Sequence, residues 1–148
     1  MLLTGSFSRS MDEKLRLAIP KRLRVALGCS QEGNLYVAPG TDQSLTLYAE
    51  EEFARLAQRV GQMSPTRPDV RAFVRIFYTL SERVELDGQG RVRIPAKLAE
   101  MAGLKKKVVL LGVQDHLELW PLDRWEDYLA DKQAHYDEIA ETALGSNE

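Results

Sequence analysis

The stretch Asp87-Gly-Gln-Gly-Arg91-Val-Arg-Ile94-Pro95 decides the fold of this chain, because an ungapped second version of it occurs 75 residues earlier. That version reads Asp12-Glu-Lys-Leu-Arg16-Leu-Ala-Ile19-Pro20, and the Asp, Arg, Ile and Pro are identical in the two motifs. Further along, Leu45-Thr-Leu47-Tyr48 matches Leu117-Glu-Leu119-Trp120 at an offset of 72. Such ordered self-similarity predicts two copies of one unit of about 75 residues.

Two units of this size are each marginal alone, because a short chain buries too little of its surface on folding. The full chain has 148 residues, of which 44% are hydrophobic and 28% charged, and this composition excludes disorder along its whole length. We therefore expect the two units to share one hydrophobic core. The single cysteine, Cys29, cannot form an internal disulfide, so the core must hold without a covalent cross-link.

The sequence contains no stretch typical of a membrane segment or an export signal. The longest strongly apolar run, Val108–Val113, is far shorter than the roughly 20 residues that cross a bilayer. Gly5, Ser6 and Arg9 follow the first three residues, where a signal peptide would have its apolar segment. We expect a cytoplasmic protein.

The second motif has the pattern of a β-hairpin. Arg91–Ile94 alternates charged and apolar side chains with the period of a half-buried strand, and Val84–Leu86 before it alternates as well. Between these two stretches, Asp87–Gly90 has the composition of a tight turn. The sequence therefore predicts that the two stretches pair with each other across this turn.

Helices are expected after each motif and near the end of each unit. Proline suits the start of a helix and glycine the residue after its end, so Pro20 with Gly28 and Pro95 with Gly103 each bracket a short helix. Apolar residues at helical spacing predict longer helices over residues 50–60, 69–80 and 122–143. Strands are expected over Val108–Val113 and Leu117–Trp120, and Phe53 corresponds to Trp125 in the repeat.

Strand alternation turns the basic residues of both motifs outward. Leucine, valine and isoleucine at alternate positions of each motif face the core, so the residues between them face solvent. The outward set is Lys14, Arg16, Ala18, Arg91 and Arg93. Arginines on the outer face of a two-stranded ribbon can enter the major groove of DNA and bind guanine O6 and N7. The pattern also allows a simpler interpretation, in which these arginines only keep an edge strand soluble.

An acidic residue precedes each of these arginines by four positions. A carboxylate beside a DNA-facing arginine repels phosphate, so a structural role is expected for Asp12 and Asp87. Each would accept N–H bonds of its turn or orient the following arginine.

The charge is separated along the chain. The net charge of −2 argues by itself against a nucleic-acid partner. Residues 1–24, however, carry six basic against two acidic residues, and residues 91–107 carry six against one. Residues 114–148 carry ten acidic and two basic residues. Two basic islands that are copies of one motif therefore accompany an acidic C-terminal segment.

The two D-x-x-x-R motifs, each followed by an apolar pattern and Ile-Pro, resemble the MraZ family of bacterial transcriptional regulators. The resemblance extends over Phe73–Phe77, Glu85–Pro95 and Leu117–Trp120, in the family order. It implies an α+β fold, in which a duplicated swapped-hairpin β-barrel of the AbrB-like, double-psi type carries peripheral α-helices. Residues 1–63 would be the first swapped-hairpin repeat with its helix, residues 64–82 a connecting helix, and residues 83–148 the second repeat with the C-terminal helix.

The resemblance also implies a function in the cytoplasm, at the nucleoid. Family members bind double-stranded DNA at short direct repeats in their own promoter, upstream of the division and cell-wall genes, and assemble into rings. The DNA-binding positions would be Lys14, Arg16, Arg91 and Arg93, and the motif-supporting ones Asp12, Pro20, Asp87, Gly90 and Pro95. One departure is Leu15, which stands where the family has glycine, so the first turn is expected to differ in shape from the second.

The sequence also bears on two other classes of function. An enzyme is disfavoured, because the sequence lacks a nucleophile motif, a phosphate loop and paired metal ligands. His135 shares a helix face with Asp131, and His116 lies in an expected turn, but no third ligand accompanies either histidine, so no metal or cofactor is expected. The alternative is an antitoxin-like or scaffold protein that uses the same barrel and binds another protein through its aromatic, acidic C-terminal helix.

Overall fold

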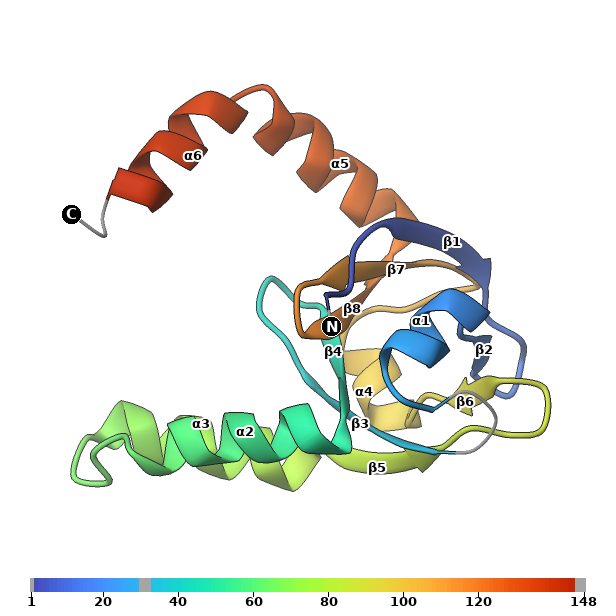
Figure 1. Ribbon diagram of the computed structural model, residues 1–148, viewed down its shortest axis with the longest axis horizontal. Coiled ribbons are helices and arrows are strands. Elements are labelled where there is room, and N and C mark those ends of the chain that lie inside the picture. The colour runs from blue at the N-terminus through green and yellow to red at the C-terminus, as the bar shows by residue number, and fades with distance from the viewer. Residues whose placement is uncertain (1, 30–32, 146–148) are drawn as a thin grey trace.

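The computed structural model describes residues 2–29 and 33–145, which form two antiparallel sheets and six helices (Figure 1). The strands are β1 (Ser6–Ser10), β2 (Arg16–Ala18), β3 (Asn34–Pro39), β4 (Leu45–Ala49), β5 (Glu82–Glu85), β6 (Arg91–Arg93), β7 (Lys107–Val113) and β8 (His116–Pro121). The helices are α1 (Lys21–Ala26), α2 (Glu50–Gly61), α3 (Pro68–Leu80), α4 (Ala96–Met101), α5 (Leu122–Gln133) and α6 (Tyr136–Gly145). The chain is an α+β protein, as predicted. None of the helices in these ranges is long and apolar enough to span a bilayer.

The strand order carries the internal repeat. The larger sheet has the order β1-β7-β8-β4-β3-β5, and the smaller one pairs β2 with β6. In the repeat, β1 corresponds to β5, β3 to β7 and β4 to β8. Exchanging each strand of the larger sheet for its counterpart gives the same strand order read from the other end. The two copies are therefore related by a local two-fold axis through both sheets.

The register of the strands places matching residues of the two copies on this axis. Leu17 and Val92, which occupy the same position of the two motifs, lie directly opposite each other between β2 and β6. In the larger sheet Thr46 of β4 lies opposite its counterpart Glu118 of β8. The axis therefore passes between β2 and β6 and between β4 and β8.

The prediction that β5 and β6 pair as a hairpin is wrong, although the turn between them is present. The backbone N–H of Asp87 donates to the carbonyl of Arg91 (2.8 Å), and the N–H of Gly90 donates to that of Asp87 (3.0 Å). Beyond this turn the strands separate, since β5 pairs with β3 and β6 pairs with β2. The physical reason is burial, because the pairing across the two copies encloses Leu17 and Val92 completely.

One hydrophobic cluster draws its side chains from both copies. Its fully buried members include Leu17, Leu35, Leu45, Leu47, Val92, Ile94, Leu98, Leu110, Leu117 and Leu119. Each such side chain contributes about 1.5–3 kcal/mol when it is fully removed from water. Cys29 also lies in this cluster as a buried free thiol.

Aromatic side chains attach a long helix of each copy to the opposite face of the larger sheet. Phe53 of α2 stacks on Tyr36 with ring centroids 4.3 Å apart and meets Tyr48 at 5.9 Å. Trp125 of α5 meets Trp120 edge-on at 5.4 Å. The sequence match of Phe53 with Trp125 is therefore a match of structural position.

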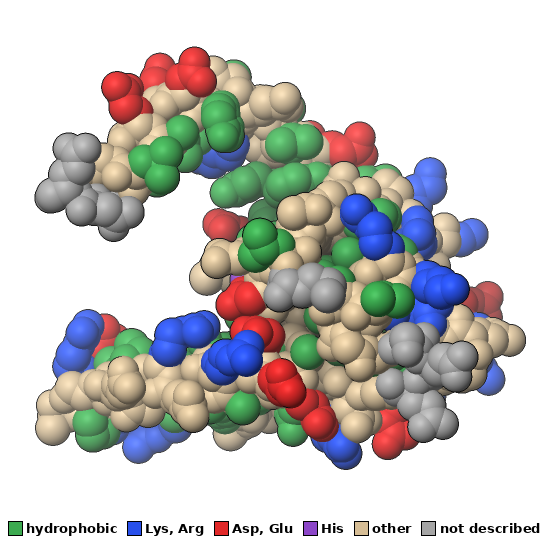
Figure 2. All heavy atoms as spheres, viewed as in Figure 1, with side chains coloured by type: hydrophobic (Ala, Val, Ile, Leu, Met, Phe, Trp, Pro, Cys, Tyr) green, Lys and Arg blue, Asp and Glu red, His purple; other side chains and the backbone are tan. Residues whose placement is uncertain are grey.

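Two helical projections leave the sheets on the same side (Figures 1 and 2). One is the helical hairpin formed by α2 and α3, and the other is the C-terminal arm formed by α5 and α6. The sequence predicts one helix over residues 122–143, but the arm breaks at Ala134-His135. Lys132 lies in the last turn of α5, and Asp137 with Glu138 lies in the first turn of α6. These charges favour two short helix dipoles over a single long one.

The two motif turns have the same backbone, which corrects the expectation that Leu15 changes the first turn. Leu15 has φ 62° and Gly90 has φ 74°. The N–H of Leu15 donates to the carbonyl of Asp12 at 3.0 Å, as that of Gly90 does to Asp87. A left-handed backbone costs a residue with a side chain about 1–2 kcal/mol. Leu15 offsets that cost because its half-buried side chain packs against the main core.

The difference between Leu15 and Gly90 is matched by a second difference on the helices. A Cβ atom at Gly90 would lie 2.8 Å from the guanidinium carbon of Arg24, so this arginine of α1 covers the glycine. The residue of α4 that corresponds to Arg24 is Ala99, which belongs to the same cluster that Leu15 packs against. Each turn therefore faces a helix of the other copy. The large Leu15 goes with the small Ala99, and the small Gly90 goes with the large Arg24.

We expect Gly90→Ala to lower the free energy of unfolding by about 2 kcal/mol, because alanine pays for a left-handed backbone and displaces the Arg24 guanidinium. Gly88→Ala, two residues away in the same turn, is the matched control, since a Cβ there meets nothing within 4 Å. Urea unfolding of both variants measures the difference. Equal stabilities of the two variants would contradict this account of the turn.

Candidate nucleic-acid interface

The basic motif residues gather on the outer face of the two-stranded ribbon formed by β2 and β6. Leu17 and Val92 point into the core and are completely buried. Arg16, Arg91 and Arg93 alternate with them along the ribbon, and Arg93 is exposed. The predicted inward and outward sets of residues are therefore confirmed.

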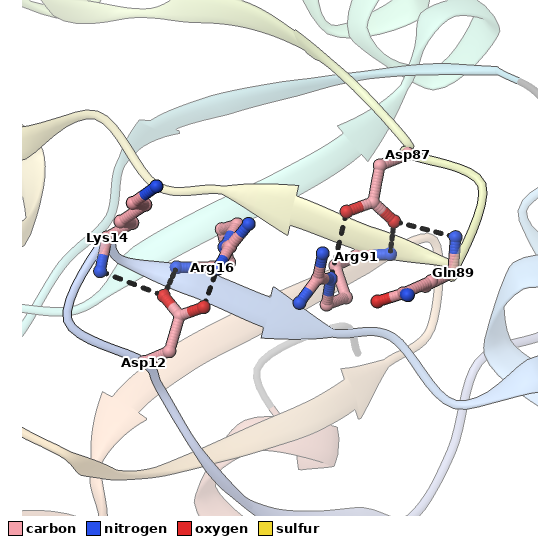
Figure 3. A network of polar contacts seen from close by, with 6 residues as sticks. All are labelled: Asp12, Lys14, Arg16, Asp87, Gln89 and Arg91. Atoms are coloured by element: carbon pink, nitrogen blue, oxygen red, sulfur yellow. Dashed lines mark hydrogen bonds and ion pairs between the residues drawn. The ribbon is translucent and has the colours of Figure 1, made fainter.

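Asp12 organises the first turn and its arginine (Figure 3). One carboxylate oxygen accepts the backbone N–H groups of Lys14 (2.9 Å) and Arg16 (2.8 Å). The other oxygen accepts the side-chain Nε–H of Arg16 at 2.6 Å. A single carboxylate thus fixes the turn and the direction of the arginine together.

Asp87 repeats this arrangement in the second turn (Figure 3). Its Oδ1 accepts the backbone N–H groups of Gln89 (2.8 Å) and Arg91 (2.9 Å), and its Oδ2 accepts the Nε–H of Arg91 at 2.9 Å. The charge pattern predicts that each aspartate either accepts N–H bonds of its turn or orients its arginine. Each aspartate does both.

These bonds leave the ends of the arginines available. Both aspartates contact the Nε atom, and within residues 2–29 and 33–145 the terminal nitrogens of Arg16 and Arg91 bond to no protein group. Guanine recognition uses two parallel N–H donors of one guanidinium. The Nε bonds therefore hold each guanidinium in one orientation while its outer donors face solvent.

The other two predicted residues are less restrained. Lys14 and Arg93 are exposed, and neither side chain bonds to a group in the described ranges. Arg93 lies directly opposite Arg16 across the ribbon. The structure thus brings Arg16 and Arg93 together at one end of the ribbon, whereas Arg91 lies near the other end beside Ala18.

The hydrogen bonds of the turns also lower the pKa values of the two aspartates. The backbone N–H of Arg16 is the largest cause that holds the pKa of Asp12 below its ordinary value, and the Arg16 and Lys14 bonds add to it. The backbone N–H of Arg91 has the same effect on the pKa of Asp87. Both carboxylates therefore stay ionised, and keep their arginines, over the whole physiological range of pH.

One residue near the interface was missed. Arg24 covers Gly90 and donates its Nε–H to the carbonyl of Ile19 at 3.0 Å, so it supports the second turn from the helix of the first copy. The sequence signal for Arg24 is a pair of differences between the two repeats, since Leu15 corresponds to Gly90 and Arg24 corresponds to Ala99. Neither difference alone indicates that Arg24 supports the turn.

The two histidines lie beside acidic side chains. His116 contacts Asp115 (2.7 Å) and Glu118 (3.9 Å), and the Glu118 carboxylate is the main cause that raises the pKa of His116. His135 lies 3.8 Å from Glu138 on the surface of the arm. Among the residues that the structure describes, no group of three histidine, cysteine or acidic side chains is placed to hold a metal ion.

The pKa values of the aspartates predict how stability depends on pH. The pKa of each aspartate is lower in the folded protein than in the unfolded chain, where it is about 3.9. Each carboxylate therefore adds to the free energy of unfolding at pH values above the unfolded pKa. This contribution is lost as the pH falls through the folded pKa. We therefore expect the double variant Asp12→Asn with Asp87→Asn to lose less stability on acidification than the wild type. Urea unfolding at a series of acidic pH values measures it.

Asp127→Asn is the matched control, because Asp127 is exposed on α5 and far from the ribbon. Its stability should fall with pH as steeply as that of the wild type. Parallel pH curves for the wild type and the double variant would show that the two turn carboxylates are not coupled to folding.

Both halves of the chain match the same family of known proteins. The family model described as "MraZ protein, putative antitoxin-like" matches the chain twice, over residues 2–76 and over residues 77–147. The boundary between the two matches lies within α3. Each match contains one turn of the ribbon, with its aspartate and arginine.

Whole relatives are similar along nearly the full chain. A protein of Lactiplantibacillus plantarum is 38% identical over 140 residues, which cover 95% of this chain and 96% of that protein. Proteins of Alkaliphilus oremlandii (38% over 136 residues, 92% of each chain) and Limosilactobacillus reuteri (39% over 140 residues, 95% of this chain and 96% of the other) are similar to the same extent. Each carries the name transcriptional regulator MraZ. This chain belongs to the MraZ family, and its two copies of the repeated unit are two MraZ domains.

Proposed function

We propose that this protein is a sequence-specific DNA-binding transcriptional regulator of the MraZ type. It acts in the cytoplasm, at the nucleoid, on short direct repeats in its own promoter upstream of the division and cell-wall genes. The names of the relatives support regulation of transcription. The observation that carries DNA binding is the β2–β6 ribbon, whose outer face holds three arginines while its inner face is buried.

The ribbon suits the major groove of DNA. A two-stranded antiparallel ribbon fits that groove, where a guanidinium can donate two hydrogen bonds to guanine. Arg16 and Arg91, each held at Nε, read bases in this proposal. Lys14 and Arg93, whose side chains are unrestrained, contact phosphate or bases at the edge of the site.

The aspartates fit this function despite their charge. Each carboxylate neutralises the charge next to Nε, which weakens general attraction to phosphate. In return, the guanidinium needs little further ordering when it binds, so less side-chain entropy is lost. Such an arrangement favours selection of a base sequence over non-specific affinity.

We further propose that the ribbon and the larger sheet together make a swapped-hairpin barrel of the double-psi type. Residues 1–63 form the first repeat, residues 64–82 connect, and residues 83–148 form the second repeat. The exchange of strand partners supports this arrangement, because β5 and β6 leave one turn and pair in different sheets. Asp12 and Asp87, with Gly90, Pro20 and Pro95, act as its supporting residues.

Assembly into a ring is part of the proposal. Exposed apolar side chains lie on both projections, namely Met63, Phe73 and Ile76 on the hairpin and Tyr128, Leu129, Tyr136, Ile139 and Leu144 on the arm. Figure 2 shows hydrophobic side chains on the inner side of the curved arm and basic ones along the hairpin. The hairpin is rich in arginine and the arm in acidic residues, so the arm of one subunit complements the hairpin of the next. Such head-to-tail contacts close into rings when the rotation allows.

A ring would also supply affinity that one ribbon lacks. A good bidentate contact discriminates between bases by only about 1–3 kcal/mol. Several subunits that bind spaced direct repeats together raise the affinity through effective concentration, without a new kind of contact. We therefore expect weak binding by a single subunit and specific binding by the oligomer.

The DNA proposal is tested with Arg16→Ala and Arg91→Ala in gel-shift titrations on the protein's own upstream DNA, over a series of salt concentrations. Each variant should bind roughly 10-fold or more weakly, because it loses one base contact. The affinity of the wild type should fall steeply with salt through counterion release. Arg83→Ala, on the edge strand β5 outside the ribbon and both projections, is the matched control and should bind like the wild type. Equal affinity of the wild type for scrambled DNA would reject specific regulation.

The ring proposal is tested with Ile76→Asp, which places a charge on the exposed apolar face of α3. We expect a smaller assembly by light scattering and weaker binding to DNA with several repeats. Thr41→Asp adds the same charge at an exposed polar position between β3 and β4, outside both projections, and should keep the assembly. An unchanged mass for Ile76→Asp would exclude this face from the contact between subunits.

An antitoxin-like or scaffold function is the alternative, favoured by the exposed aromatic face of the acidic arm. A second protein that copurifies in fixed ratio, and whose binding survives Arg16→Ala, would support this alternative over DNA binding.

A further inference from the structure

The outer face of the β2–β6 ribbon has two-fold symmetry in its backbone. Leu17 and Val92 lie opposite each other on the local axis, so the axis exchanges Arg16 with Arg91. Both arginines bond through Nε to an aspartate four residues earlier, with the same backbone contacts. A ribbon that kept this symmetry throughout would bind a DNA site equally well in either direction, and its preferred site would be a palindrome.

One pair of side chains breaks this symmetry on the outer face. The axis exchanges Ala18 with Arg93, and both are exposed. Because Arg93 lies opposite Arg16, one end of the ribbon carries two arginines at paired positions. At the other end Arg91 lies opposite Ala18 and is the single arginine.

The paired arginines are costly without an anionic partner. Side chains that face each other across an antiparallel pair lie about 4.5–5.5 Å apart at Cβ, and like charges there are destabilising. Asp12 neutralises Arg16, whereas Arg93 has no acidic partner among the described residues. A ligand with negative potential between the two guanidinium groups would remove the repulsion, and the guanine-rich floor or the phosphate rim of the major groove has that potential.

A second pair of side chains related by the axis also differs between the two copies. The axis relates Lys14 in the first turn to Gln89 in the second, and both are exposed. The lysine lies in the turn that ends at Arg16, at the end that already holds two arginines. Glu13 beside it, whose counterpart is Gly88, leaves the two turns with equal net charge, so the lysine adds a hydrogen-bond donor at that end and no net charge.

We propose that these two pairs, Ala18 with Arg93 and Lys14 with Gln89, set the direction in which each subunit reads DNA. The inference rests on the proposed DNA-binding function and deepens it. The end with Arg16, Arg93 and Lys14 takes the part of the site with more guanine and phosphate contacts, and the end with Arg91 takes the other part. Each subunit then recognises a non-palindromic sequence, and equally oriented subunits require sites repeated in one direction.

The test is selection of binding sites from duplex DNA with a random window about one helical turn long. The double variant Ala18→Arg with Gln89→Lys makes the three outward positions of the two motifs identical. We expect the wild type to enrich a non-palindromic sequence and the double variant to enrich a sequence much closer to a palindrome. Its control is Thr41→Arg with Gln114→Lys, the same two added charges at exposed turn positions outside the ribbon and both projections, which should enrich the wild-type sequence.

A subtractive variant covers the case in which the added charges impair folding. Arg93→Ala also equalises positions 18 and 93, and it removes the arginine pair without adding charge. We expect it to bind the wild-type site roughly 10-fold more weakly and to enrich a more symmetric sequence. Thermal unfolding of each variant checks that the fold is intact.

The outcomes separate this inference from the proposed function. A palindrome enriched by the wild type, or the same non-palindromic sequence enriched by the wild type and both ribbon variants, would overturn the assignment of direction and leave DNA binding intact. No enrichment by the wild type would overturn the proposed function, and the assignment with it. A shift toward symmetry in the ribbon variants alone supports the inference.

Discussion

The structure depends on the pairing of β2 with β6, which encloses Leu17 and Val92 between the two copies. Three residues of each copy form this ribbon, and a strand of that length has little stability of its own. The ribbon holds because its inner side chains are completely buried in a cluster to which both copies contribute. The same burial fixes the parity of each strand, so the arginines between the core residues must face solvent. Fold and interface therefore follow from one packing constraint.

The sequence predicted most of the elements because their signals are local. Alternation within a motif, proline before a helix and glycine after it are properties of neighbouring residues, and the short helices α1 and α4 follow them. The repeat also predicted which residues occupy equivalent places, as the positions of Phe53 and Trp125 show. The two aspartates were assigned a structural role from charge alone, and in the structure each carboxylate bonds to both its turn and its arginine.

Most of the failures share one physical cause, which is that the deciding contact lies in the other copy. A turn between two alternating stretches predicts a hairpin, but the partner of β6 is 75 residues away in the first copy. Leu15 was expected to reshape its turn, yet it packs against a core that includes the small Ala99 of the second copy. The polar strand β1, whose pairing with an edge of the sheet depends on β7, gave no signal in the sequence. The break in the arm at Ala134-His135 has a different and local cause, namely the charges on both sides of it that favour two helix ends.

The local two-fold axis has a consequence for how such a protein can change over time. Two separate chains of one unit could form the same pair of sheets as a homodimer, but every substitution would then appear on both sides of the axis at once. Joining the units in one chain releases them from that identity. Leucine can replace glycine in one turn if arginine becomes alanine on the facing helix, and a neutral residue can stand where its counterpart is charged. Covalent fusion thus converts a symmetric assembly into one whose halves acquire separate tasks while they still fold as one body.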